Sequence, residues 1–264
     1  MNTPEVKFEL PSIDDETTMI FHFCYEKSRG GLDWSEAVYK HHPKLKEMLL
    51  GVKDKEEFYK ICHDYTDNFI RENKEILEKT RDHYQKVWEE TEDLFFNNLS
   101  KDFETDFPEE INKIIAKVSI NPICPRNIDS WSFHVYYKFH SIRVKTTCIH
   151  EIIHFLYFKK WSEIFSDYDD KKFNGPNSEW KLSEILVHSI INNNKMIQGI
   201  INNEYSDVYK EWQSIKINDR KLVDYFGDIY REHEDGKISF EDFLKKSWSE
   251  YQKHRNIIEK DILG

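Results

Sequence analysis

The strongest structural pattern in the sequence is KTTCIHEIIHFLYF, residues 145–158. It predicts an α-helix, on which two histidines four residues apart, His150 and His154, project from the same face. Their imidazoles can then share one metal ion, expected to be Zn²⁺. Glu151 follows the first histidine and stays near the metal, where it can polarise a water as general base. The segment therefore predicts a zinc site built on a helix.

The residues around the motif predict that this helix is buried. From Cys148 to Phe158 the only charged or imidazole side chains are those of the motif itself. Apolar side chains cover nearly the whole circumference: Ile149, Ile152, Ile153, Phe155, Leu156 and Phe158. Two histidines and a carboxylate are costly to bury without partners, and a metal ion supplies one. The alternative is a pair of core histidines hydrogen-bonded to carbonyls or carboxylates.

The same segment resembles the extended signature of the zincin metallopeptidases. In that signature Thr or Val precedes the first histidine by three residues, uncharged residues flank the motif and an apolar residue follows. The matching positions are Thr147, Cys148, Ile152, Ile153, Phe155 and Leu156. The metzincin branch needs a Gly and a third His where this chain has Tyr157 and Lys160. The resemblance is therefore to the thermolysin-like gluzincins, and it covers about residues 130–191.

The gluzincin resemblance implies a third zinc ligand, a glutamate on a following helix. The apolar segment KLSEILVH, residues 181–188, matches such a helix, and Glu184 follows His154 by 30 residues. The alternative role for Glu184 is an acidic residue in a first helical turn, where the helix dipole favours it. Four residues later the family commonly has an Asp that holds a ligand histidine, whereas this chain has His188. We expect His188 to be either such a supporting partner or the third ligand itself.

A strand is expected before the motif helix, from the aromatic and β-branched residues of WSFHVYYKF, residues 131–139. The resemblance implies an edge strand that pairs with an extended substrate backbone. An ordinary core strand is the alternative. Hydrolysis also needs a donor for the developing oxyanion. No motif selects among the candidates, which are Tyr136, Tyr137, Tyr205, Tyr225, Tyr230 and His233.

The whole chain predicts an α+β fold, mostly helical, with a small sheet next to the HExxH helix in a zincin-like arrangement. Residues 1–34 look irregular and end in a turn at Gly30-Gly31. The expected elements after them are helices over about 34–99, a short helix over 108–116, a helix over about 145–165, a polar loop over 167–178, a helix over about 183–191, and further helices with breaks near Gly227 and Gly236. These elements form a helical region 1–110, a catalytic core 111–200 and a helical region 201–264, within one compact unit.

Charge and composition argue against several partners. The chain has 38 Lys and Arg against 49 Asp and Glu, a net charge of -11, which argues against nucleic acid. No apolar run is long enough to span a bilayer, and the N-terminus has no secretory signal, so we expect a cytoplasmic protein without membrane anchoring. Its four cysteines lack CxxC spacing and are expected to be reduced.

A calcium loop is not expected near the C-terminus. The segment DGKI, residues 235–238, resembles the middle of such a loop, but Arg231 and His233 stand at the positions of hard oxygen ligands. Ser239 and Asp242 instead predict a capping box at the start of a helix.

Two hypotheses follow for function. In the first, His150, His154 and Glu184 bind Zn²⁺ and Glu151 activates a water that hydrolyses a peptide or protein substrate. In the second, the zinc is structural or regulatory and the helical surfaces bind a protein partner. A closed site with His188 as a fourth protein ligand favours the second.

Overall fold

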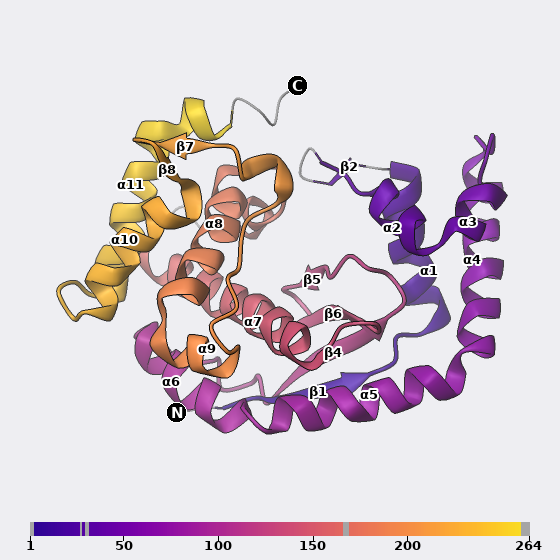
Figure 1. Cartoon of the computed structure of the whole chain (residues 1–264), viewed down its shortest axis with the longest axis horizontal. Helices are drawn as coiled ribbons and strands as arrows, with labels where there is room; N and C mark the ends of the chain where they lie inside the picture. The colour runs from indigo at the N-terminus through magenta and orange to yellow at the C-terminus, as the bar shows by residue number, and fades with distance from the viewer. Residues whose placement is uncertain (1–2, 27, 30–31, 166–168, 260–264) are drawn as a thin grey trace. The chain divides into compact units, whose positions relative to one another are not determined.

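The computed structural model describes residues 3–26, 28–29, 32–165 and 169–259, so the expected turn at Gly30-Gly31 lies outside them. The described chain is mostly helical with a small mixed sheet, which confirms an α+β fold (Figure 1). It divides into two compact units, one within residues 1–4, 91–112 and 148–264 (unit 1) and the other within 5–90 and 113–147 (unit 2). The chain enters each unit more than once, so the units do not coincide with the regions 1–110, 111–200 and 201–264.

Unit 2 combines the four-stranded sheet with helices from the first third of the chain. Its elements are β1 (Glu5–Glu9), α1 (Ile13–Phe21), the π-helix η1 (His22–Glu26), β2 (Ser28–Arg29), β3 (Leu32–Asp33), α2 (Ser35–His41), α3 (Pro43–Met48), α4 (Lys55–Glu72), α5 (Lys74–Glu89), β4 (Lys113–Ser119), β5 (Arg126–Asn127) and β6 (Ser132–Tyr136). The helices confirm the expectation for residues 34–99. The described part of residues 1–34 is not irregular as expected, because most of it lies in β1, α1, η1, β2 and β3.

The sheet has the order β1-β4-β6-β5, with β1, β4 and β6 parallel and β5 antiparallel. Alternation along the strands separates an apolar face from a polar face. The apolar face carries Phe8, whose ring meets Tyr84 of α5, and Figure 1 shows α5 running along β1. The polar face carries Lys117 and Ser119, which contact α1 through Asp15 and Glu16.

Two expectations about this sheet are wrong. Residues 108–116 do not form a helix, because β4 begins at Lys113 and buries Ile114, Ala116 and Val118 at every second position. The strand over 131–139 is confirmed as β6, but it is not an edge strand. It lies between β4 and β5, and all five of its residues are buried.

Unit 1 holds the helices that follow. Its elements are α6 (Glu92–Asp102), most of α7 (Ser141–Ile164), the 3₁₀ helix η2 (Asp170–Phe173), α8 (Ser178–Asn193), α9 (Lys195–Ile200), η3 (Lys210–Trp212), the hairpin strands β7 (Lys216–Ile217) and β8 (Arg220–Lys221), α10 (Leu222–Glu234) and α11 (Phe240–Ile258). The first residues of α7, up to Thr147, belong to unit 2. None of the helices in the described part of the chain is long and apolar enough to cross a membrane.

Helices α7 and α8 confirm the two helices expected over 145–165 and 183–191, each with extra turns. The polar loop over 167–178 is interrupted by η2, and residues 167 and 168 lie outside the described residues. The predicted cap of α11 is confirmed, since the backbone N–H of Asp242 donates to Ser239 Oγ at 3.0 Å. The break at Gly236 is also confirmed, with φ at +71°.

The break expected at Gly227 is wrong, because this glycine lies inside α10 where α10 packs on α8. A Cβ atom there would lie 2.6 Å from Nδ2 of Asn193 on α8. Both ends of the Asn193 amide are hydrogen-bonded, since Nδ2 donates to the carbonyl of Ser189 at 2.7 Å and Oδ1 accepts from Arg231 at 2.6 Å. The glycine therefore permits the close approach of the two helices.

We expect Gly227→Ala to lower the free energy of unfolding by about 1–3 kcal/mol, because the added methyl group must displace the Asn193 amide. Gly199→Ala is the matched control, since Gly199 also lies in a helix and a Cβ there would meet no atom within 4 Å. That variant should gain up to about 1 kcal/mol from helix propensity. Urea unfolding of both variants measures the difference, and equal stabilisation by both would contradict the packing role of Gly227.

Glu16 is a fully buried carboxyl group in unit 2. Its Oε1 accepts hydrogen bonds from Ser119 Oγ at 2.6 Å and from the backbone N–H of Asn121 at 3.0 Å. Burial outweighs these hydrogen bonds and raises the pKa of Glu16 to about 7. Because the folded pKa lies above the unfolded value, the protonated carboxyl stabilises the protein fully below about pH 4.5, and this contribution is lost as the pH rises through about 7.

We therefore expect Glu16→Gln to be close to neutral at pH 5 and to stabilise the protein at pH 8 by about 3 kcal/mol, an order-of-magnitude figure. The amide keeps an acceptor for Ser119 and Asn121 and never ionises. Urea unfolding of the wild type and variant at both pH values measures the change. A difference between the two proteins that does not vary with pH would show that Glu16 does not titrate in this range.

Candidate metal centre

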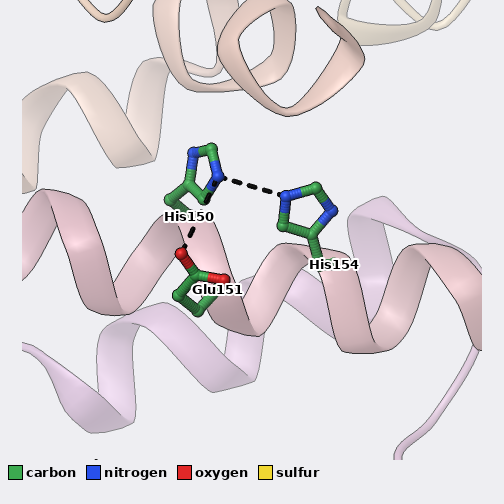
Figure 2. A group of neighbouring side chains, drawn as sticks. All are labelled: His150, Glu151 and His154. Carbon is green, nitrogen blue, oxygen red and sulfur yellow. Dashed lines mark hydrogen bonds and ion pairs between the residues drawn. The ribbon is translucent and has the colours of Figure 1, made fainter. Parts of the chain in front are cut away.

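The motif residues lie in the middle of α7, in its unit 1 part. The stretch from Glu151 to Phe158 is buried throughout, as the apolar residues around the motif predict. The His154 side chain is fully buried, and the His150 side chain keeps 16% of its surface exposed. Figure 2 shows both rings on the same side of α7, as a spacing of four residues requires.

The two rings face each other and a carboxylate from the next helix. Nε2 of His150 and Nε2 of His154 lie 3.1 Å apart. Glu184, on α8, reaches both rings. Its Oε2 lies 3.5 Å from Nε2 of His150, and its Oε1 lies 3.4 Å from Nε2 of His154. The structure thus brings together the three residues that the sequence predicts as metal ligands.

These separations match the ligand set of a metal ion. In tetrahedral zinc sites with bonds of about 2.0–2.1 Å, neighbouring ligand atoms lie about 3.3–3.4 Å apart. The distances from the Glu184 oxygens to the rings exceed an ordinary N–H···O hydrogen bond of about 2.7–3.2 Å. Two imidazoles and one carboxylate that converge at this spacing fit a zinc ion with three protein ligands, which leaves one position for another ligand.

Glu151 lies beside this group. Its Oε1 is 3.9 Å from Nε2 of His150, and its side chain is 7% exposed. His150, Glu151 and His154 offer ligand atoms that all lie within 4.8 Å of one another. Figure 2 shows the carboxylate reaching toward the His150 ring from the adjoining part of the helix. It is therefore close enough to exchange a proton with a group bound between the histidines.

Aromatic neighbours hold the ring of His154 in position. It stacks on Phe158, one turn further along α7, with ring centroids 5.7 Å apart. Phe158 in turn stacks on Phe173 of η2 at 4.1 Å. The loop between α7 and α8 thus supports a histidine as well as returning the chain.

Glu184 is held from a different direction by Tyr209, whose hydroxyl donates to its Oε2 at 3.1 Å. The Tyr209 ring packs against Trp180, on α8, and Trp212, on η3, with ring centroids 6.2 and 5.2 Å away. A hydroxyl that fixes one carboxylate oxygen orients the other, as supporting groups around metal ligands do. Sequence reasoning missed Tyr209, since it belongs to no motif and stands 25 residues after Glu184.

His188 lies next to the site. Its ring centroid is 4.9 Å from that of His150. Its Nδ1 is within hydrogen-bond distance of Ser206 Oγ, at 2.7 Å. This placement is compatible with both expected roles, a partner beside a ligand histidine or a ligand.

The six candidate oxyanion donors are divided between the two units. Tyr136 and Tyr137 belong to unit 2. In unit 1, the hydroxyls of Tyr205, Tyr225 and Tyr230 donate to Asp224, Glu250 and Asp102. His233 also pairs with Asp102, with Nε2 3.1 Å from Oδ1. None of these four residues has Glu151 or Glu184 as its carboxylate partner in these contacts. The structure therefore selects none of the four as an oxyanion donor at the site.

Comparison of the chain with protein-family models, with curated proteins and with solved structures finds no significant match to any of them.

Proposed function

We propose that this protein is a zinc-dependent peptidase of the gluzincin type. In this proposal His150, His154 and Glu184 bind Zn²⁺, and Glu151 is the general base. The observation that carries it is the convergence of Nε2 of both histidines and the Glu184 carboxylate at 3.1–3.5 Å, with Glu151 beside them. The HExxH pattern on a buried helix, with a glutamate on the next helix, supports the gluzincin type and a zincin-like arrangement of the fold.

Each residue has a distinct part in the reaction. A zinc ion bound here would supply Lewis acidity for a peptide carbonyl and would lower the pKa of a water to about 7. Glu151 takes a proton from the attacking water and passes it to the leaving amine. Tyr209 holds the Glu184 carboxylate through Oε2. His150, with the most exposed side chain of the four charged or imidazole residues, lies on the side that a peptide substrate reaches.

A non-catalytic zinc module is the second candidate, and one observation favours it. His188 packs 4.9 Å from His150 and can complete a closed site as a fourth protein ligand. Zinc would then stabilise unit 1, whose helical surfaces would bind a protein partner. The two candidates differ in the number of protein ligands and in whether Glu151 takes part in a reaction.

Zinc content and its dependence on Glu184 give the first test. Metal-replete protein should contain about one zinc per chain by elemental analysis. Glu184→Ala should weaken zinc binding strongly, because it removes a ligand, whereas His188→Ala should weaken it about 10–100-fold, as a supporting residue does. Competition with a chromophoric chelator measures both affinities.

Glu179→Ala is the matched control for this series. Glu179 lies on the same helix and pairs with Lys172, with Nζ and Oε1 3.7 Å apart. Its loss should leave zinc affinity unchanged. The reverse order for the Glu184 and His188 variants would make His188 the third ligand and would remove the basis for a gluzincin assignment. A chain that takes up no transition metal at all would end the proposal.

Glu151→Gln separates zinc binding from chemistry. The amide cannot accept a proton, so cleavage of a peptide substrate should fall by about 10²–10⁴-fold while the zinc content stays the same. A quenched fluorescent peptide library measures cleavage, and elemental analysis of the same samples measures zinc. Glu163→Gln, on the same helix and paired with Lys159, is the control and should keep its activity. Full activity in Glu151→Gln would refute the assigned role of Glu151. Zinc-loaded wild type without cleavage of any peptide would favour the structural module.

A further inference from the structure

Unit 2 contains a pocket of about 220 Å³ between α1 and the polar face of the sheet. Its polar lining comes from α1, β4, β5 and β6 and includes Asp15, Lys117, Arg126, Asn127, Ser132 and His134. All of these residues belong to unit 2, so the pocket is formed within one compact part of the chain. Its volume is below the ~300–1,000 Å³ of pockets that hold drug-sized ligands, which indicates a small ligand.

His134 forms part of this lining as a buried, neutral ring. The parallel pairing of β4 with β6 places it directly beside Lys117. It is 6% exposed, and burial, followed by the charge of Lys117, lowers its pKa to about 4. Its Nδ1 is buried and has no hydrogen-bond partner among the described residues. A buried polar atom of this kind is costly unless a ligand or water satisfies it.

The charged side chains around His134 determine whether the pocket favours an anion or a cation. Lys117 Nζ pairs with Asp15 Oδ2 at 3.1 Å, and the Asp15 side chain is 52% exposed, which puts the one carboxylate among the described lining residues at the rim. Arg126 adds a second cation. Among the described lining residues, two cations stand against one carboxylate, which favours an anion over a metal ion there, although the chain as a whole has a net charge of -11. A guanidinium group also matches the planar geometry of carboxylate and phosphate oxygens.

We propose that this pocket binds the carboxylate or phosphate group of a small organic anion, held by Arg126 and Lys117 and by a hydrogen bond from His134. The neutral imidazole can donate from Nδ1 when the proton resides there. Met19 and Pro125, which also line the pocket, provide apolar contact for the rest of such a molecule. The site is independent of the zinc proposal, because it uses no residue of unit 1.

Titration of the full-length protein with two simple probes tests the proposal. Sodium phosphate and sodium acetate are added at constant pH and ionic strength, with sodium chloride as the reference salt, and the ring signals of His134 are followed by NMR. Saturable shifts with at least one probe are expected, with a Kd on the order of 1 mM for so small an anion. The phosphate and acetate arms then distinguish a phosphate ester from a carboxylic acid as the natural ligand class.

Variants identify the residues responsible. Arg126→Gln should weaken binding at least about tenfold. Lys113→Gln is the matched control and should bind as the wild type does, because Lys113 lies on β4 as Lys117 does and forms the same kind of ion pair as Lys117, with Glu9 at 2.6 Å, but does not line the pocket. If Arg126→Gln does not fold, Lys117→Gln takes its place with the same expectation. Shifts that do not saturate with either probe, or unchanged affinity in the folded variant, overturn the proposal.

Discussion

The contact between the Glu184 carboxylate and two imidazole rings is the constraint on which the candidate centre in unit 1 depends. Glu184 and His154 are almost fully buried, and both sit on helices whose other faces are apolar. Isolated polar groups in such surroundings would destabilise the fold by several kcal/mol. The observed register of α7 and α8 brings these groups together. Two further segments support it, Tyr209 at Glu184 and Phe173 at Phe158, on which His154 stacks.

The close packing of the other helices supports this register. Helix α10 lies against α8 at Gly227, where the Asn193 amide occupies the space that a side chain would fill. The same amide accepts a hydrogen bond from Arg231 on α10 and donates one within α8. Asn193 follows Glu184 by nine residues, about half a turn away around α8, so α10 packs on the side of α8 opposite the carboxylate.

Much of the site could be predicted from the sequence, because the chemistry is local to two helices. A spacing of four residues determines that His150 and His154 share a face. The gluzincin resemblance implies Glu184, the single carboxylate of the apolar segment 181–188, as the third member. Tyr209 could not be predicted, since its position depends on the path of a loop. In the fold, β4 was missed because its alternation of Lys with Ile, Ala and Val extends over only seven residues after Pro108. Gly227 predicted a helix break because glycine disfavours helices, but packing against Asn193 outweighs that preference.

The candidate metal centre in unit 1 and the pocket in unit 2 have opposite electrostatic character, and they therefore favour different ligands. In unit 1, Glu151 and Glu184 are two carboxylates close to imidazoles that are good metal donors, so the local charge favours a divalent cation. In unit 2, Lys117 and Arg126 surround a histidine that burial keeps neutral, and the one carboxylate lies at the rim, so the local charge favours an anion. Each arrangement would be unfavourable for the other's ligand, because a like charge brought into a partly desolvated site is repelled far more strongly than in water. A histidine in a buried cluster therefore does not by itself indicate a metal. The charges of the side chains that share its pocket determine which kind of ligand it serves.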